Sequence, residues 1–266
     1  MICYLQFAKN VFQSKLAYRM NVFLSILHRI ATLFVEVSIW SAIISQTGEI
    51  STEMGMISLK EMVSYAILST GISIIISSNT ILEFEDKIRT GQIAMDLIKP
   101  MKFKLYLFFE NLGNNLFRII FELIPVVIVG ILCFGIDTPS REYAFFFLIA
   151  LINGMIIYFI LTCILGQLSF WLLTVWHLDK LLNDMLKIFS GRFIPLWFFP
   201  KIFIIISAFL PFRLIYFSPM SIYLEKVSKI EIGNILIQQI GWILILFILD
   251  TILWKKGINK LVVQGG

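Results

Sequence analysis

Two charged residues lie within a long apolar stretch at a spacing that allows their side chains to meet. Arg118 and Glu122 are four residues apart, which places them on one face of a helix. Glu36 lies near the middle of another apolar run, nearly two turns after Arg29. Charged groups inside apolar segments are costly and usually face a protein interior or a water-filled path. We interpret these charges as structural ion-pairing groups or, alternatively, as polar contacts along a substrate path or a subunit interface.

No catalytic motif accompanies these charges. The sequence has no glycine-rich nucleotide loop of the GxxxxGK(S/T) or GxGxxG type, and no HExxH or GxSxG motif. Its three cysteines are an odd number without close spacing, which favours neither a disulfide framework nor a metal site. His177 and Asp179 form an HxD pair that we interpret as a solvated turn. We therefore expect that this chain is not an enzyme and binds no cofactor or metal.

Composition indicates a membrane protein. The 266 residues are 59% hydrophobic and only 15% charged, with a mean hydropathy of +0.89, whereas soluble domains are about half apolar and a quarter charged. The net charge of +5 comes from Lys and Arg in segments expected on the cytoplasmic side. No basic-aromatic strip that could stack nucleic-acid bases is present. We predict an all-α integral membrane protein that contacts lipid and no nucleic acid.

The apolar runs predict one interfacial helix followed by a single domain of six transmembrane spans. Residues 1–20 alternate apolar and basic positions, which is typical of a helix lying in the membrane interface. The next apolar run is longer than a signal-peptide core and has no small-residue cleavage site, so we expect it in the mature protein. Basic residues near both ends place both termini in the cytoplasm. Within residues 21–266, spans are expected at about 22–46, 61–82, 105–134, 142–166, 180–193 and 233–254.

Two segments interrupt this pattern. Residues 83–104 are the most charged part of the chain and are predicted to form an inner loop between the second and third spans. Residues 191–224 are rich in aromatic side chains and carry four prolines, which one uninterrupted helix cannot hold without repeated kinks. We expect broken, re-entrant helices dipping into the outer leaflet between spans five and six. The four prolines are Pro195, Pro200, Pro211 and Pro219.

Together these features resemble the ABC-2 type permeases of bacterial ATP-binding-cassette exporters, over the whole chain. The resemblance rests on EFEDKIRTGQIAMDLIKPM at 83–101, SGRFIPLWFFPKIFIIISAFLPFRLIYFSPMSIYL at 190–224, the basic start and the terminal Gly265-Gly266. It implies a permease that pairs with itself or with a sister permease, while separate ATPase subunits bind ATP and Mg²⁺. It also implies that 1–20 is an elbow helix and that the proline-rich region helps to close the exit of the pathway.

In such permeases the first inner loop carries a coupling helix that fits a groove on the ATPase, and here it corresponds to about residues 85–97. Its charged side chains would offer a water-facing surface to the partner, while Ile88, Ile93 and Leu97 would anchor it on the membrane domain. The alternative is an ordinary solvated loop. The residues expected to take part in coupling are Glu85, Asp86, Lys87, Arg89, Gly91 and Asp96.

The expected function is therefore that of a permease subunit in the bacterial cell membrane, which exports a hydrophobic or amphipathic cargo such as a drug, a peptide or a lipid-linked molecule. The many aromatic residues suit such a cargo but suit lipid contact equally well. Alternatives are a non-transporting scaffold or immunity protein, a secondary transporter, and a membrane-embedded enzyme acting on lipids. The charged inner loop favours ATPase docking over secondary transport, and no inverted repeat is visible in the sequence.

Overall fold

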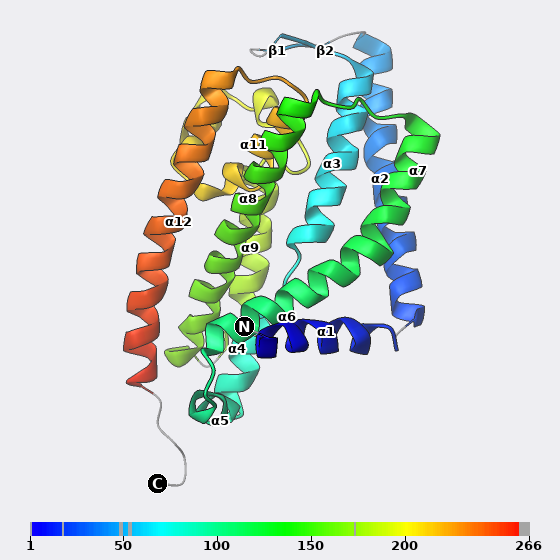
Figure 1. Ribbon diagram of the computed structural model, residues 1–266. Helices are drawn as coiled ribbons and strands as arrows, with labels where there is room; N and C mark the ends of the chain where they lie inside the picture. The colour runs from blue at the N-terminus through cyan, green and yellow to red at the C-terminus, as the bar shows by residue number, and fades with distance from the viewer. Residues whose placement is uncertain (1, 18, 48–49, 53–54, 173, 261–266) are drawn as a thin grey trace.

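Long helices run side by side in a bundle, with one helix lying across its lower end (Figure 1). The computed structural model describes residues 2–17, 19–47, 50–52, 55–172 and 174–260. The crossing helix is α1 (Ile2–Lys15), the orientation expected of an interfacial helix. The bundle consists mainly of α2 (Arg19–Thr47), α3 (Leu59–Ile76), α6 (Phe103–Arg118), α7 (Ile124–Phe134), α8 (Arg141–Gln167) and α12 (Lys229–Ile258).

The all-α membrane architecture is confirmed. Among the described residues, five helices are long and apolar enough to cross a membrane, or six if one bent pair counts as a single span. The fifth predicted span corresponds to α9 (Trp176–Phe189), whose 14 residues rise only about 21 Å. Helix α9 is not among the helices long enough to cross, and the sixth candidate span is instead the bent pair Lys201–Ala208 with Pro211–Tyr223 in the proline-rich region. The five long spans are Met20–Ser45, Leu59–Arg89, Phe103–Phe134, Arg141–Phe170 and Lys229–Ile258.

Two of these spans are interrupted. The second ends as α3 and resumes after three residues as α4 (Thr80–Arg89). The third widens into a π-helical turn, η1 (Ile119–Leu123), where the N–H of Ile124 donates to the carbonyl of Ile119 five residues earlier. Pro125 follows and has no N–H for the carbonyl four residues before it, so the hydrogen-bond ladder changes register at this point.

Helix α3 lies at the centre of the bundle. Its span is 72% buried, compared with 11% to 33% for the other four. Its hydroxyl groups reach the segment that follows α9: Tyr65 donates to the carbonyl of Gly191, and Ser69 donates to the carbonyl of Arg192 at 2.5 Å. Gly191 has a φ of +73°, a left-handed conformation that glycine adopts without strain. These contacts fix the start of the proline-rich region against the core.

The proline-rich region is broken into short helices, as its prolines predict. Its axis bends by 82° between Lys201–Ala208 and Pro211–Tyr223. Each proline lies just before a helix or in its first turn, where a missing N–H leaves no hydrogen bond unmade. Thus Pro195 precedes η3 (Leu196–Phe198), Pro200 precedes α10 (Lys201–Ala208), Pro211 begins η4 (Pro211–Leu214) and Pro219 lies in α11 (Phe217–Tyr223).

Helix α1 packs closely along α6. The ring of Tyr4 stacks on that of Phe109, with centroids 5.5 Å apart. A Cβ added at Gly113 would lie 2.3 Å from the carbonyl oxygen of Ala8, a distance that no side chain tolerates. The crossing of these two helices therefore depends on a glycine at the contact.

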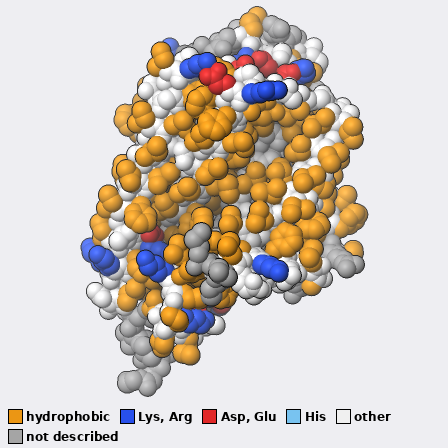
Figure 2. Space-filling model, in the orientation of Figure 1, with side chains coloured by type: hydrophobic (Ala, Val, Ile, Leu, Met, Phe, Trp, Pro, Cys, Tyr) orange, Lys and Arg blue, Asp and Glu red, His pale blue; other side chains and the backbone are white. Residues whose placement is uncertain are grey.

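The molecular surface has the distribution expected in a bilayer. Apolar side chains cover the middle of the face seen in Figure 2, and charged side chains gather toward its two ends. The upper end carries a small antiparallel hairpin, β1 (Ile50–Thr52) with β2 (Gly55–Ile57). The lower end carries α1, α4 and α5 (Gln92–Ile98). Many large apolar side chains of the outer helices are exposed between these ends, as expected of a surface that faces lipid.

Candidate functional site

The charged inner segment forms a corner of two short helices at the lower end of the bundle (Figure 1). Helix α4 leads through Thr90 and Gly91 into α5. Gly91 has a φ of +74° and caps α5, so any other side chain there would be strained. The coupling element expected at residues 85–97 is therefore two helices meeting at a turn, and we call it the α4–α5 corner.

The inward face of the α4–α5 corner packs on the bundle. Phe84 and Ile93 are fully buried in a cluster that also holds the first turn of α6. An added Cβ at Gly166 of α8 would lie 2.8 Å from the Phe84 ring, which shows how closely the two helices approach. Ile88 and Leu97 pack against the same cluster. All three apolar residues expected to anchor this element thus face the membrane domain.

Lys87 and Asp96 join the two helices of the corner from within. Lys87 Nζ lies 2.8 Å from Asp96 Oδ2 and 5.2 Å from the centre of the Tyr106 ring. Lys99 Nζ lies 2.6 Å from the other carboxylate oxygen. Burial by itself would raise the pKa of Asp96, but hydrogen bonds from Lys87 and Lys99 outweigh it and lower this pKa below its ordinary value. Lys87, expected on the water-facing surface, is therefore mostly buried and braces the corner together with Asp96.

Glu85 also makes an internal contact. Its carboxylate accepts a hydrogen bond of 3.1 Å from the backbone N–H of Val175, directly before α9. Charge-assisted hydrogen bonds of this kind are stronger than neutral ones. Glu85 therefore ties the corner to the helix that leads into the proline-rich region, a role that its sequence position does not reveal.

The water-facing side of the corner combines one exposed ion pair with two apolar side chains. Asp86 and Arg89 are both well exposed and lie 3.4 Å apart. Met95 and Ile98 are 65% and 79% exposed and are three residues apart on α5, so they share one helix face. The charged residues of this surface were predicted from the sequence. The apolar pair was not, although the three-residue spacing of Met95 and Ile98 could have indicated it.

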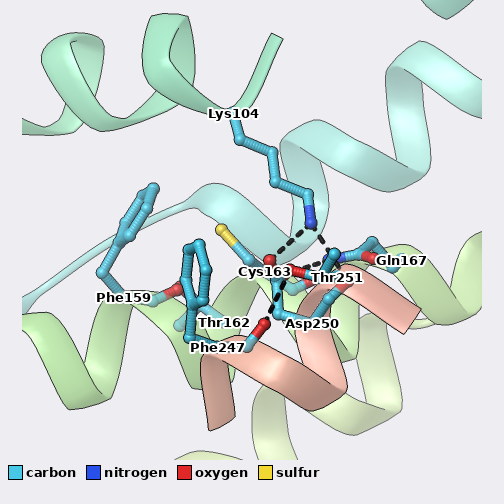
Figure 3. A network of polar contacts seen from close by, with 8 residues as sticks. All are labelled: Lys104, Phe159, Thr162, Cys163, Gln167, Phe247, Asp250 and Thr251. Atoms are coloured by element: carbon cyan, nitrogen blue, oxygen red, sulfur yellow. Dashed lines mark hydrogen bonds and ion pairs between the residues drawn. The ribbon is translucent and has the colours of Figure 1, made fainter. Parts of the chain in front are cut away.

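A buried polar network connects the start of α6 with α8 and α12 (Figure 3). Lys104 Nζ lies 2.5 Å from Asp250 Oδ2 and 3.1 Å from the Asp250 carbonyl oxygen. Gln167 Nε2 donates to Asp250 Oδ1 at 2.5 Å. Each carboxylate oxygen thus has a donor, as buried charges require. These residues were not predicted from the sequence, in which the one signal for them is that Asp250 lies inside an apolar run.

The charges within the first and third spans pair differently from the sequence prediction. Arg118 Nη1 donates to the carbonyl of Ser77 at 2.6 Å, where α3 ends. Glu122 lies 3.8 Å from Arg29 of α2, and Arg29 also donates to Ser73. Arg118 and Glu122, whose spacing allows a pair on one helix face, thus contact other segments instead, and Glu122 forms an ion pair with another helix. Glu122 lies within the π-helical turn η1, and Arg118 lies directly before it.

Glu36 is partly buried in α2 and lies near Thr70 of α3 and Arg192. Arg29 likewise reaches other helices, where it contacts Glu122 and Ser73, so both charged residues of α2 are directed across to other helices, as their positions suggested. Together these contacts make α3 the meeting point of charged side chains from three segments. We interpret these contacts as structural links between helices inside the bundle.

Comparison with known proteins agrees with this geometry. The family model described as ABC-2 family transporter protein matches residues 30–265. The chain belongs to this family. None of the curated proteins matches it. As an ABC-2 transporter it is the membrane-spanning transport component, a permease, of an ABC transporter. In the part of the chain that the structure describes, no three His, Cys, Asp or Glu side chains gather in a way that could hold a metal ion.

Proposed function

We propose that this ABC-2 permease is part of an ATP-driven exporter and that its α4–α5 corner docks a separate ATPase subunit. The observation that supports the proposal best is the exposed pair Met95 and Ile98 on a corner that is braced from within. Exposed apolar patches away from lipid mark interaction sites. The flanking charges of Asp86 and Arg89 would then select and orient the partner.

The charge distribution supports a cytoplasmic position for the lower end. Lys99 and Lys102 follow α5, and Lys255 and Lys256 lie in the last turn of α12 at the same end. Lys and Arg are enriched on the cytoplasmic side of membrane proteins. With α1 also at this end, both terminal helices would face the cytoplasm of a bacterial cell, where ATP is available.

The contacts of the corner suggest how a movement of the ATPase would reach the spans. Glu85 ties α4 to the start of α9, and Lys104 ties the start of α6 to α12. A rigid corner displaced by its partner would thus move several helices together. ATP and Mg²⁺ would be bound by the ATPase, and this chain's residues would contribute only the docking surface and the linked helices. Alternating access requires that nucleotide favours one of two such states.

The remaining parts of the proposal concern partner and cargo. A second permease, identical or related, would complete the pathway, and the proline-rich region would help to close its outer exit. The aromatic and aliphatic lining of the bundle suits a hydrophobic or amphipathic cargo, such as a drug, a peptide or a lipid-linked molecule. Export as the direction of transport follows from the family resemblance of the inner and outer segments.

Co-purification with the ATPase tests the docking surface. We would co-express the permease with its candidate ATPase, purify through a tag on the permease, and measure bound ATPase per permease. Changing Met95→Ser and Ile98→Ser together should reduce bound ATPase at least about tenfold, because central apolar anchors dominate interface affinity. Ile230→Ser is the matched control, since Ile230 is 81% exposed on α12 at the opposite end.

A second variant tests the charges without disturbing the internal contacts. Reversing the exposed pair with Asp86→Arg and Arg89→Asp leaves the Glu85 contact with Val175 intact, and it should weaken association and change its salt dependence. Full retention of the ATPase by the Met95 and Ile98 variant, with the protein still eluting as a single folded species, would overturn the proposal. A scaffold or a secondary transporter would then be the better interpretation.

A further inference from the structure

A cavity of about 310 Å³ lies at the upper end between the proline-rich region and the first three turns of α12. This volume is at the low end of the range of ligand pockets, about 300 to 1,000 Å³, so it suits one head group rather than a large molecule. Trp197, Arg213 and Ser221 line it from the broken helices, and Glu231 and Asn234 line it from α12. It is far from the α4–α5 corner and plays no part in docking the ATPase.

Two hydrogen-bond donors of this cavity have no acceptor. Trp197 Nε1 and Arg213 Nε are buried, and neither has a hydrogen-bond partner among the described residues. Trp197 is only 7% exposed, so its N–H cannot be satisfied at the surface. Arg213 makes one long hydrogen bond of 3.4 Å to Gln238, and no carboxylate of the described chain lies within ion-pair distance of it. Both groups can only donate hydrogen bonds, so an occupant of the cavity must supply an acceptor. Because the guanidinium is positively charged, it favours an anionic acceptor.

The depth of the cavity indicates where the acceptor comes from. Helix α12 has 30 residues and is therefore about 45 Å long, about 15 Å more than a hydrocarbon core. Glu231 and Asn234 lie in its first two turns, which fall at head-group depth. Ile237, about one turn deeper on α12, is a strongly exposed apolar side chain that would contact acyl chains. An occupant that combines an anionic group with acyl chains meets both conditions.

We propose that this cavity binds the phosphodiester of a phospholipid head group from the upper leaflet. Trp197 Nε1 and Arg213 Nε would donate to its non-bridging oxygens. The carboxylate of Glu231, which accepts from the N–H of Ser228 and is otherwise exposed, stands at the mouth. It disfavours a head group of net negative charge and favours one that carries an ammonium group, such as ethanolamine. The inference concerns a lipid site that the proposed exporter function does not require.

Native mass spectrometry of the purified full chain tests the proposal. The probes are phosphatidylethanolamine, phosphatidylglycerol, a diacylglycerol of the same acyl chains, and inorganic phosphate. We expect retained phosphatidylethanolamine, weaker phosphatidylglycerol and no retained diacylglycerol. Arg213→Gln should reduce phosphatidylethanolamine binding at least about tenfold, because it removes a charge-assisted contact. Arg141→Gln is the matched control, since Arg141 is exposed at the same end and does not line the cavity.

The contribution of Trp197 needs a control for ring packing. Trp197→Phe keeps an aromatic ring but removes the N–H, and it should weaken phosphatidylethanolamine binding. Trp40→Phe is the control, since Trp40 is also buried and aromatic-stacked but lies outside the cavity. Equal retention of diacylglycerol and phosphatidylethanolamine by the wild-type protein would overturn the proposal without any variant. Binding of inorganic phosphate but of no phospholipid would overturn the head-group assignment.

Discussion

Lys104 and Asp250 are 146 residues apart in the sequence, yet their side chains form an ion pair of 2.5 Å. Lys104 is the second residue of α6, directly after the α4–α5 corner, and Asp250 lies in the lower half of α12. Gln167 extends the contact to α8. Side chains with fixed partners thus link the residues that follow the corner to two further spans.

This ion pair leads to the first prediction, a double-mutant cycle. Lys104→Met or Asp250→Leu alone should lower the free energy of unfolding by about 3 kcal/mol, because each leaves a buried charge without its partner. The double variant should lose less than the sum of the two, since two apolar side chains of similar volume replace the pair. Unfolding in a titration with sodium dodecyl sulfate measures all three values.

The exposed pair Asp184 and Lys187, 2.8 Å apart on α9, is the control for that cycle. Its removal should leave the unfolding free energy nearly unchanged, because solvent screens exposed ion pairs. If the loss of unfolding free energy in the double variant equals the sum of the losses in the two single variants, Lys104 and Asp250 do not act as a pair.

The five long spans and the breaks at the four prolines were predictable because they depend on local properties of the chain, whereas the break between α3 and α4 and the π-helical turn were not predicted. Long apolar runs specify membrane helices through length and hydropathy alone, and the four prolines specify where helices begin. Gly91 likewise marks a turn in the charged segment, where the structure has a left-handed residue. The family resemblance rested on these same local features, and the matching family model covers residues 30–265.

The orientation of individual charges was not predictable from local pattern. Lys87 and Asp96 are nine residues apart and meet only because the chain turns at Gly91. Glu122 of the third span lies 3.8 Å from Arg29 of the first span, because α2 packs against the π-helical turn. Such pairs depend on tertiary packing, which overrides residue spacing. For the same reason the sequence predicted a mixed-charge docking surface, whereas the structure exposes Asp86 and Arg89 beside an apolar pair.

Glycine-dependent packing of α1 on α6 gives the second prediction. Gly113→Ala should destabilise the protein by about 1 to 3 kcal/mol, because the added methyl group would overlap the backbone of Ala8, which cannot rotate away. Gly241→Ala is the control: nothing lies within 4 Å of its added Cβ on α12, and alanine should stabilise a helix there by up to about 1 kcal/mol. Detergent unfolding of both variants checks the opposite signs; destabilisation of equal size would contradict the close contact.

The bracing role of Asp96 gives the third prediction, a pH dependence. The lowered pKa of Asp96 means that the unfolded chain binds its proton more readily than the folded protein does. Its stabilisation is therefore complete above the ordinary carboxyl pKa of about 4 and is lost as the pH falls through the lower folded-state pKa. Asp96→Asn should reduce the melting temperature at neutral pH, and the difference from wild type should shrink as the pH decreases toward 3.

Asp86→Asn is the comparison for that measurement, because Asp86 pairs with Arg89 in an exposed position. Its melting temperature should remain close to that of the wild-type protein across the same pH range. A difference between wild type and Asp96→Asn that stays constant from pH 7 to pH 3 would show that the asparagine acts through packing and not through lost charge.

The last prediction concerns Arg118, whose guanidinium donates a hydrogen bond to the backbone carbonyl of Ser77 at the break in the second span. Because α3 ends at Ser77, the carbonyl of Ser77 is not bonded by an N–H of the same helix. It accepts a hydrogen bond of 2.6 Å from Arg118 instead. Within a bilayer an unpaired carbonyl finds no water. Arg118→Met should therefore cost about 1 to 3 kcal/mol of unfolding free energy. Arg118→Lys keeps a donor and should cost less, and Arg89→Met, at an exposed position, should cost little. Equal losses for the lysine and methionine variants would show that a charged donor at this position does not stabilise the protein, which would contradict the role assigned to the hydrogen bond with Ser77.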